Sequence, residues 1–78
     1  MTTKYEIYGS ARCPYTSEMR DWLEFKGHDY TEYDVEADPA ALARLRTLCP
    51  GQHAIPVLVQ DGCVAEIGWR GRSCVVAV

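Results

Sequence analysis

Short apolar runs alternate with two helix-type patterns along this chain, and this order restricts the folds that it can adopt. Residues 5–8 contain β-branched and aromatic side chains and are followed by Gly9, as expected for a strand that ends in a loop. A helical pattern begins near Cys13, where Pro14 suits the first turn, and it ends at Gly27. The residues that recur at three- and four-residue steps form one face of this helix, and they are Tyr15, Met19, Trp22, Leu23 and Lys26.

A second strand and a second helix follow. Residues 28–35 alternate polar and apolar side chains, which predicts a strand with one side partly buried. Asp38 can cap a helix whose first turn holds Pro39, and Pro50 with Gly51 ends that helix. The predicted buried side of this helix consists of Leu42, Leu45, Leu48 and Cys49.

The last third of the chain predicts a β-hairpin. Residues 55–60 form an apolar strand, Asp61 and Gly62 are typical of a tight turn, and residues 63–67 form the returning strand. We therefore predict an α/β fold in the order β-α-β-α-β-β, with a four-stranded mixed sheet. The first two strands are expected to pair in parallel through a right-handed crossover. Residues 1–78 are expected to form a single domain with a thin core.

The composition is typical of an ordinary soluble globular protein. Of the 78 residues, 47% are hydrophobic and 24% are charged, and the net charge is −3. Because there is no basic excess, we expect no nucleic-acid partner. No apolar stretch reaches the ~20 residues of a membrane span, and no apolar signal segment precedes the first strand. We therefore expect no membrane association and a cytoplasmic location.

The four cysteines are expected to be reduced thiols. Cys13, Cys49, Cys63 and Cys74 show none of the close pairings of a secreted disulfide scaffold. The Cys-x-x-Cys pairs of structural zinc sites are also absent from the sequence, and its two histidines are far apart. We expect no metal site.

Cys13 is a candidate reactive thiol because it lies where a predicted strand leads into a predicted helix. Unpaired backbone N–H groups and the helix dipole can stabilise a thiolate at that position. Arg12, immediately before it, can add a positive charge. An exposed thiolate of lowered pKa attacks a disulfide and forms a mixed disulfide with one of its sulfur atoms. Thiol–disulfide exchange is therefore the expected chemistry.

The arrangement of these motifs resembles a glutaredoxin of the thioredoxin superfamily. A strand leads to Cys-Pro-Tyr-Thr at residues 13–16, a second strand and helix follow, and Ile55-Pro56 opens a hairpin. The resemblance covers roughly residues 4–71 and implies a truncated glutaredoxin fold with the last helix missing, since residues 73–78 are too short and too β-branched for it. The chain also resembles a short group of glutaredoxin-like proteins, some of which have selenocysteine as the nucleophile.

This resemblance implies roles for individual residues. Cys13 is the nucleophile, Tyr15 flanks the substrate sulfur, and Gln52 contacts a ligand carboxylate. Ile55 pairs its backbone with the substrate's cysteine, and a cis bond to Pro56 leaves the Ile55 N–H and C=O free for that extended ligand. The resemblance also implies glutathione as a co-substrate, glutathione or protein disulfides as partners, and no tightly bound cofactor.

The sequence departs from the family at three places. Thr16 replaces the second cysteine of dithiol glutaredoxins, so the mechanism is monothiol unless a distant cysteine resolves the mixed disulfide. The Thr16 hydroxyl can instead form a hydrogen bond with the Cys13 thiolate. The family's lysine three positions before the nucleophile is Ser10, and the residues that bind the γ-glutamyl group of glutathione are replaced by Gly-Trp-Arg-Gly-Arg at positions 68–72.

Several further residues allow two interpretations each. Cys74 lies just beyond the turn that begins at Gly68, near the expected nucleophile, so it is either a resolving thiol or an incidental residue. Trp69 is either a stacking wall for a ligand or a plug over the sheet face that the missing helix leaves bare. His53 is either a proton donor or a solvated side chain. The acidic side chains of Glu32, Asp34, Glu36 and Asp38 are expected to form a solvated face.

Residues 73–78 form an apolar tail, and the motif at residues 13–16 has a single thiol. The tail allows several modes of assembly, and the single thiol allows several functions. Residues 73–78 can close the bare sheet face, pair with an exposed edge, or pair with a second chain, and we predict a homodimer. The leading function is a thiol–disulfide oxidoreductase. A glutathione-dependent iron–sulfur carrier ranks lower, because such proteins have Gly-Phe-Ser where this chain has Pro-Tyr-Thr. A redoxin-fold binding module without catalysis is the third alternative.

Overall fold

The computed structural model describes residues 3–76 and contains both predicted helices and the predicted hairpin in the predicted order. The elements are β1 (Tyr5–Gly9), α1 (Pro14–Phe25), β2 (Tyr30–Asp34), α2 (Pro39–Leu48), β3 (Ala54–Ile55), β4 (Val57–Gln60), β5 (Cys63–Ile67) and β6 (Cys74–Val75). Each helix starts at a proline that follows an N-cap residue, Cys13 for α1 and Asp38 for α2. The Asp38 carboxylate accepts a hydrogen bond from the Ala40 N–H at 3.0 Å, which confirms the predicted cap.

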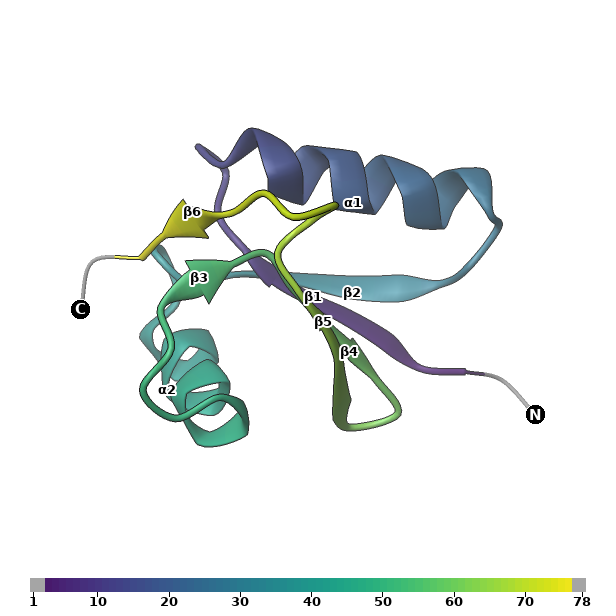
Figure 1. The fold of residues 1–78 in the computed structure, drawn as a ribbon. Coiled ribbons are helices and arrows are strands. Elements are labelled where there is room, and N and C mark those ends of the chain that lie inside the picture. Colours follow the sequence, from purple (N-terminus) through teal and green to yellow (C-terminus); the bar gives the residue numbers. More distant parts are fainter. Residues whose placement is uncertain (1–2, 77–78) are drawn as a thin grey trace.

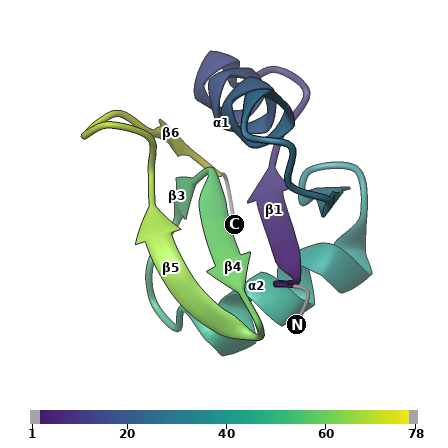
Figure 2. The same cartoon turned by 90° about the vertical axis from the view of Figure 1, so that its right-hand side faces the viewer.

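The main sheet has four strands in the order β2-β1-β4-β5. β1 and β2 are parallel, whereas β4 pairs antiparallel with both β1 and β5. The predicted four-stranded mixed sheet is therefore confirmed. The two helices lie on opposite faces of this sheet (Figure 1). Turned by 90°, Figure 2 shows β1, β4 and β5 side by side.

The core consists of one cluster on each face of the sheet. Neighbouring residues of a strand point to opposite faces. Ile7 therefore packs against Met19 and Leu23 of α1, whereas Tyr8 joins the cluster that contains Leu45 of α2. Of the predicted helix faces, Met19 and Leu23 of α1 and Leu45 of α2 are buried, whereas Lys26 is exposed.

Two predicted strands are shorter in the structure. The strand expected over residues 28–35 begins only at β2, because the His28 N–H still donates to the Leu23 carbonyl and closes α1. The strand expected over residues 55–60 is divided at Pro56, which has no N–H to donate to a sheet. The prediction of one continuous strand there is wrong.

The division at Pro56 creates a second, two-stranded sheet. β3 pairs antiparallel with β6, so that Ile55 lies opposite Cys74 and Ala54 lies opposite Val75. Both views show β6 beside β3 (Figures 1 and 2). The tail therefore pairs with an edge of its own chain, one of the alternatives that its composition predicted.

No helix follows β5 within the described residues, which end at 76. A tight turn connects β5 to β6: the Trp69 N–H donates to the Arg72 carbonyl at 2.7 Å, and the Arg72 N–H donates back at 2.9 Å. In the same part of the chain, neither helix has the length and hydropathy that a transmembrane segment requires.

Candidate active site

Cys13 lies at the carboxyl end of β1, where the chain enters α1. Its N–H donates to the Ser10 carbonyl at 3.1 Å, and its carbonyl accepts from the Thr16 N–H at 3.1 Å. The residue is only 1% exposed. The exposed sulfur that the sequence led us to expect is therefore not observed, because the tail folds over this position.

The residues around the cis proline belong to the same part of the structure. The peptide bond between Ile55 and Pro56 is cis, and Ile55 packs in the cluster that contains Cys13. The Gly68 N–H donates to the Pro56 carbonyl at 2.6 Å, which brings the Gly-rich turn beside the proline. Gly68 has a φ of +84°, and a Cβ added there would lie 2.8 Å from the carbonyl oxygen of Arg72. Only glycine suits this close approach.

Hydrogen bonds favour the thiolate form of Cys13. Burial is the largest single influence and acts to raise its pKa, but it is outweighed by hydrogen bonds from the Cys74 thiol, the Thr16 hydroxyl and the N–H groups of Thr16 and Tyr15. The pKa of Cys13 is therefore lower than that of an ordinary thiol. Thr16 thus acts on the pKa of the Cys13 thiol in the expected direction.

Cys74 packs against the cluster that contains Cys13, and its pKa is raised. Its hydrogen bond to Cys13 is the main cause that raises its pKa to about 11, followed by burial and the charge of the Cys13 thiolate. Arg12 acts in the opposite direction. All four cysteines are free thiols, so Cys13 and Cys74 belong to one packed cluster without a disulfide between them.

Arg12 takes part in a polar network that the sequence analysis missed. Its guanidinium bonds to the Glu36 carboxylate at 2.9 Å and to the Val75 carbonyl at 3.2 Å. The buried Ser10 hydroxyl donates to the other Glu36 oxygen. The hydrogen bond and charge of Arg12 lower the pKa of Glu36. Arg12 therefore connects β6 to the residues that follow β2, in addition to its charge near Cys13.

Glu36 is exposed, as expected of a solvated face, and it is also paired with Arg12. β1 and β2 are parallel neighbours, so the segments after their carboxyl ends lie at the same edge of the sheet. An acidic residue soon after β2 can therefore meet a basic residue soon after β1. Glu32 is also paired, since its carboxylate bonds to Arg20 at 3.1 Å.

Three further candidate residues, Tyr15, Gln52 and His53, differ in how far each is buried or bonded. Tyr15 is half-buried and packs against both core clusters. The Gln52 side chain donates to the Ala54 carbonyl at 2.9 Å and accepts from the Ala54 N–H at 2.8 Å. Its amide is thus occupied in shaping its own loop. His53 is exposed, and its carbonyl accepts from the Val76 N–H at 2.8 Å.

Trp69 packs in the core on the α1 face. The residue is 7% exposed and joins the cluster of Ile7, Met19, Leu23 and Leu58. Its ring lies 5.9 Å from that of Trp22, and the Arg70 guanidinium lies 5.1 Å from its centre. This position matches a plug over the sheet better than an open wall for ligand stacking.

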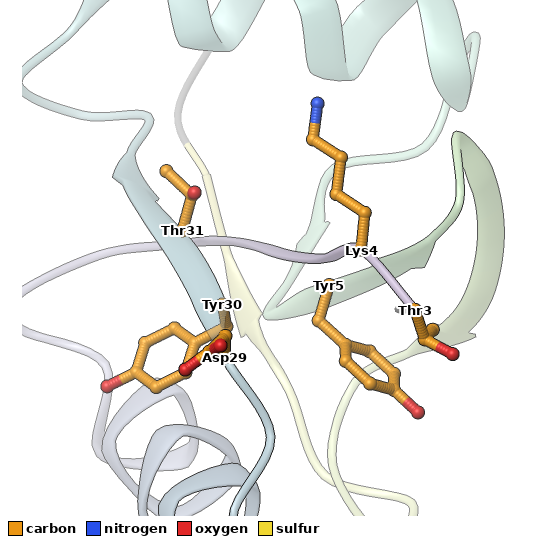
Figure 3. A pocket seen from close by; sticks show the side chains of 6 residues that line it. All are labelled: Thr3, Lys4, Tyr5, Asp29, Tyr30 and Thr31. Carbon is orange, nitrogen blue, oxygen red and sulfur yellow. The ribbon is translucent and has the colours of Figure 1, made fainter. Parts of the chain in front are cut away.

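A separate pocket of about 260 Å³ lies at the start of β1 and β2 (Figure 3). Its lining residues are Thr3, Lys4, Tyr5, Asp29, Tyr30 and Thr31. These positions lie at the opposite end of β1 from Cys13, and none of them is a cysteine or a histidine. The pocket is therefore not part of the candidate active site.

A cysteine at the start of a helix, beside a cis proline and a mixed sheet with helices on both faces, defines a thioredoxin-like protein. Two solved structures agree with this class. A mutant of the thioredoxin-like protein BC3987 is 30% identical, with a TM-score of 0.73 over 85% of this chain and 82% of that chain. Glutaredoxin 1 from Francisella tularensis, complexed with cacodylate, is 21% identical, with a TM-score of 0.62 over 87% of this chain and 85% of that chain.

The family is shown by a sequence comparison. The glutaredoxin family model matches residues 5–64, which is most of the chain, and the chain therefore belongs to the glutaredoxin family. No curated protein matches the sequence.

Proposed function

We propose that this protein catalyses thiol–disulfide exchange with Cys13 as the attacking thiol. Membership of the glutaredoxin family supports a redox role of this kind. The observation that carries the proposal is the lowered pKa of Cys13 at the start of α1, in the same cluster as the residue before the cis proline. The Cys13 thiolate attacks one sulfur of a disulfide, forms a mixed disulfide, and releases the other sulfur as a thiolate.

The proposed substrates are mixed disulfides of glutathione and disulfides of proteins. The motif supplies only one thiol, because Thr16 fills the place of the second cysteine and is itself buried at 1% exposure. Thr16 forms a hydrogen bond with the Cys13 sulfur and so supports the thiolate directly. Glutathione is therefore proposed as a co-substrate that returns the protein to its reduced form, not as a bound cofactor.

Substitution of Cys13 tests this proposal. Turnover of a glutathione mixed disulfide, with excess glutathione, is measured for the wild type and for Cys13→Ser. A serine hydroxyl is not ionised at neutral pH, so the variant should fall to the uncatalysed rate. Cys63→Ser is the matched control, because Cys63 is exposed at the start of β5 and should be dispensable.

The outcome that would contradict the proposal is turnover by Cys13→Ser at the wild-type rate. Reduction of insulin disulfides, measured with the same variants, separates the two substrate classes. If the protein turns over only the glutathione mixed disulfide, its substrates are mixed disulfides of glutathione. If it reduces only insulin, its substrates are protein disulfides.

A further inference from the structure

The C-terminal strand occupies the edge at which a substrate of this site is expected to bind. The resemblance to glutaredoxins led us to expect that the Ile55 backbone is free to pair with an extended ligand. In the structure β6 pairs with β3, and Cys74 lies directly opposite Ile55. A cysteine of the chain itself thus occupies the position expected for the cysteine of a substrate.

The tail is held over Cys13 by specific contacts. Val76 is 3% exposed and packs in the same cluster as Cys13 and Ile55, and its N–H donates to the His53 carbonyl at 2.8 Å. Arg12 donates to the Val75 carbonyl at 3.2 Å. These contacts place Cys74 against the buried cluster that contains Cys13, where each of the two thiols shifts the pKa of the other. The contact depends on β6, because the two residues are far apart in the chain.

We propose that Cys74, carried on β6, is the resolving thiol of a two-thiol cycle. The inference rests on the proposed attack by Cys13 and adds the step that follows it. In that step the Cys74 thiolate attacks the Cys13 sulfur of the mixed disulfide, a Cys13–Cys74 disulfide forms, and the substrate's second sulfur leaves as a thiolate. One substrate disulfide is reduced to two thiols while the two protein thiols are oxidised. An external thiol reductant, such as glutathione, then reduces the protein disulfide at the expense of two of its own thiols.

The electrostatics of the two thiols supports this order of events. Cys74 is the protonated partner while Cys13 is a thiolate, since the hydrogen bond to Cys13 and the charge of Cys13 both raise the pKa of Cys74. Both causes disappear once the Cys13 sulfur is part of a mixed disulfide. Burial still raises the pKa of Cys74 in that state, and Arg12 still lowers it. Cys74 therefore ionises more readily after Cys13 has reacted than before.

The reagent dithiobis-nitrobenzoate, added at one equivalent, tests the proposal in single turnover. The test uses full-length protein carrying Cys63→Ser, which removes the exposed thiol, while Cys49 is buried and has a raised pKa. Attack by Cys13 releases one nitrothiobenzoate, and attack by Cys74 releases the second. We expect about two released per reagent consumed, and about one when Cys74→Ser is added.

Peptide mapping identifies the disulfide. Cleavage after arginine separates Cys13, in residues 13–20, from Cys74, in residues 73–78, and leaves Cys49 in a third peptide. The expected product is residues 13–20 linked to residues 73–78, with no nitrobenzoate adduct. Cys74→Ser should instead retain the adduct on residues 13–20.

The two proposals fail in different ways. If the Cys63→Ser protein stops at the adduct on Cys13, with one release per reagent, the two-thiol cycle is overturned and the attack by Cys13 stands. If a further Cys13→Ser change leaves the first release equally fast, the proposed function itself fails. Linkage of residues 13–20 to the peptide that contains Cys49, in place of residues 73–78, would likewise overturn the role of Cys74.

Discussion

The reactivity of Cys13 depends on a few donors that surround one sulfur atom. Thr16 contributes both its hydroxyl and its backbone N–H, and Tyr15 contributes a backbone N–H. These groups oppose a burial of Cys13 that by itself would raise the thiol pKa. These hydrogen bonds stabilise the folded protein only at a pH where the Cys13 thiol is ionised. The stabilisation is fully present above the ordinary cysteine pKa of ~8.5, and it is lost as the pH falls through the lowered pKa of Cys13 in the folded state.

Removing the Thr16 hydroxyl should therefore make Cys13 less reactive near neutral pH. Thr16→Val keeps the shape of the side chain but deletes a hydrogen bond to a charged group, of a kind that contributes about 1.5–3 kcal/mol. The rate at which iodoacetamide alkylates Cys13 is measured as a function of pH. This curve should shift to higher pH, so that the rate at pH 7 falls severalfold. Ser17→Ala is the control, because the Ser17 hydroxyl bonds to Arg20. Superimposable curves for Thr16→Val and the wild type would contradict this role of Thr16.

Among the elements, we expect β6 to control access to Cys13. It is two residues long, and its neighbour Val76 is buried, whereas Val75 is 70% exposed. Cys13 is 1% exposed and packs in the same cluster as Val76, so we expect an external disulfide to reach its sulfur only when this strand moves away. The equilibrium between the closed and open positions of β6 should therefore set the rate of the first attack.

Loosening β6 should expose Cys13. Val76→Ala removes two methyl groups from the cluster that holds the tail, at a cost of about 1–2 kcal/mol, so the open form becomes about tenfold more populated. Alkylation of Cys13, measured at a pH above its pKa, should accelerate by the same factor. Val75→Ala is the matched control on the same strand and should leave the rate unchanged. Equal rates for the two variants would show that β6 does not limit access.

The turn that begins at Gly68 positions β6. The stability cost of replacing Gly68 can be compared with that of replacing Gly62, which has a similar backbone conformation. Gly62 has a φ of +82° with nothing near an added Cβ, whereas at Gly68 that Cβ would meet a backbone carbonyl oxygen. Gly62→Ala should cost about 1–2 kcal/mol of unfolding free energy, the cost of a left-handed conformation. Gly68→Ala should cost more, since backbone must also shift. Urea denaturation of both variants provides the comparison, and an equal loss would be the contrary result.

In the whole molecule, β5 is the least protected part of the sheet. It forms an edge, all five of its residues are exposed, and among its apolar side chains Val64 is 36% and Ile67 is 49% exposed. An exposed edge strand with apolar side chains can pair with another chain. The homodimer predicted from the apolar tail thus gains a second candidate surface, because β6 is paired within its own chain.

Sedimentation velocity at increasing protein concentration tests this prediction. We expect the wild type to associate, and we expect Val64→Lys to remain a monomer, because the charge would lie at the paired edge in both chains. Phe25→Lys is the control, since Phe25 is 79% exposed on α1 and is not part of the sheet edge. A wild type that stays a compact monomer at high concentration would contradict the homodimer.

Features that depend on neighbouring residues can be predicted from the sequence. Pro14 and Pro39 each begin a helix after an N-cap residue, and the period of the apolar residues distinguishes helices from strands. The contact of Thr16 with Cys13 also follows from local spacing, because residues three apart at a helix start lie close together. These interactions need only a few consecutive backbone angles, which the local sequence specifies.

Features that join distant segments became visible only in the folded chain. The crossover between parallel strands brings Glu36 to Arg12, and the interruption at Pro56 opens an edge at Ile55 that the tail fills. Local patterns contain no information on such pairings, since a two-residue strand has no periodicity and its register is set by the partner that it meets. Cys13 could therefore be identified from its place before a helix, whereas the contact of Cys74 with it is a consequence of packing.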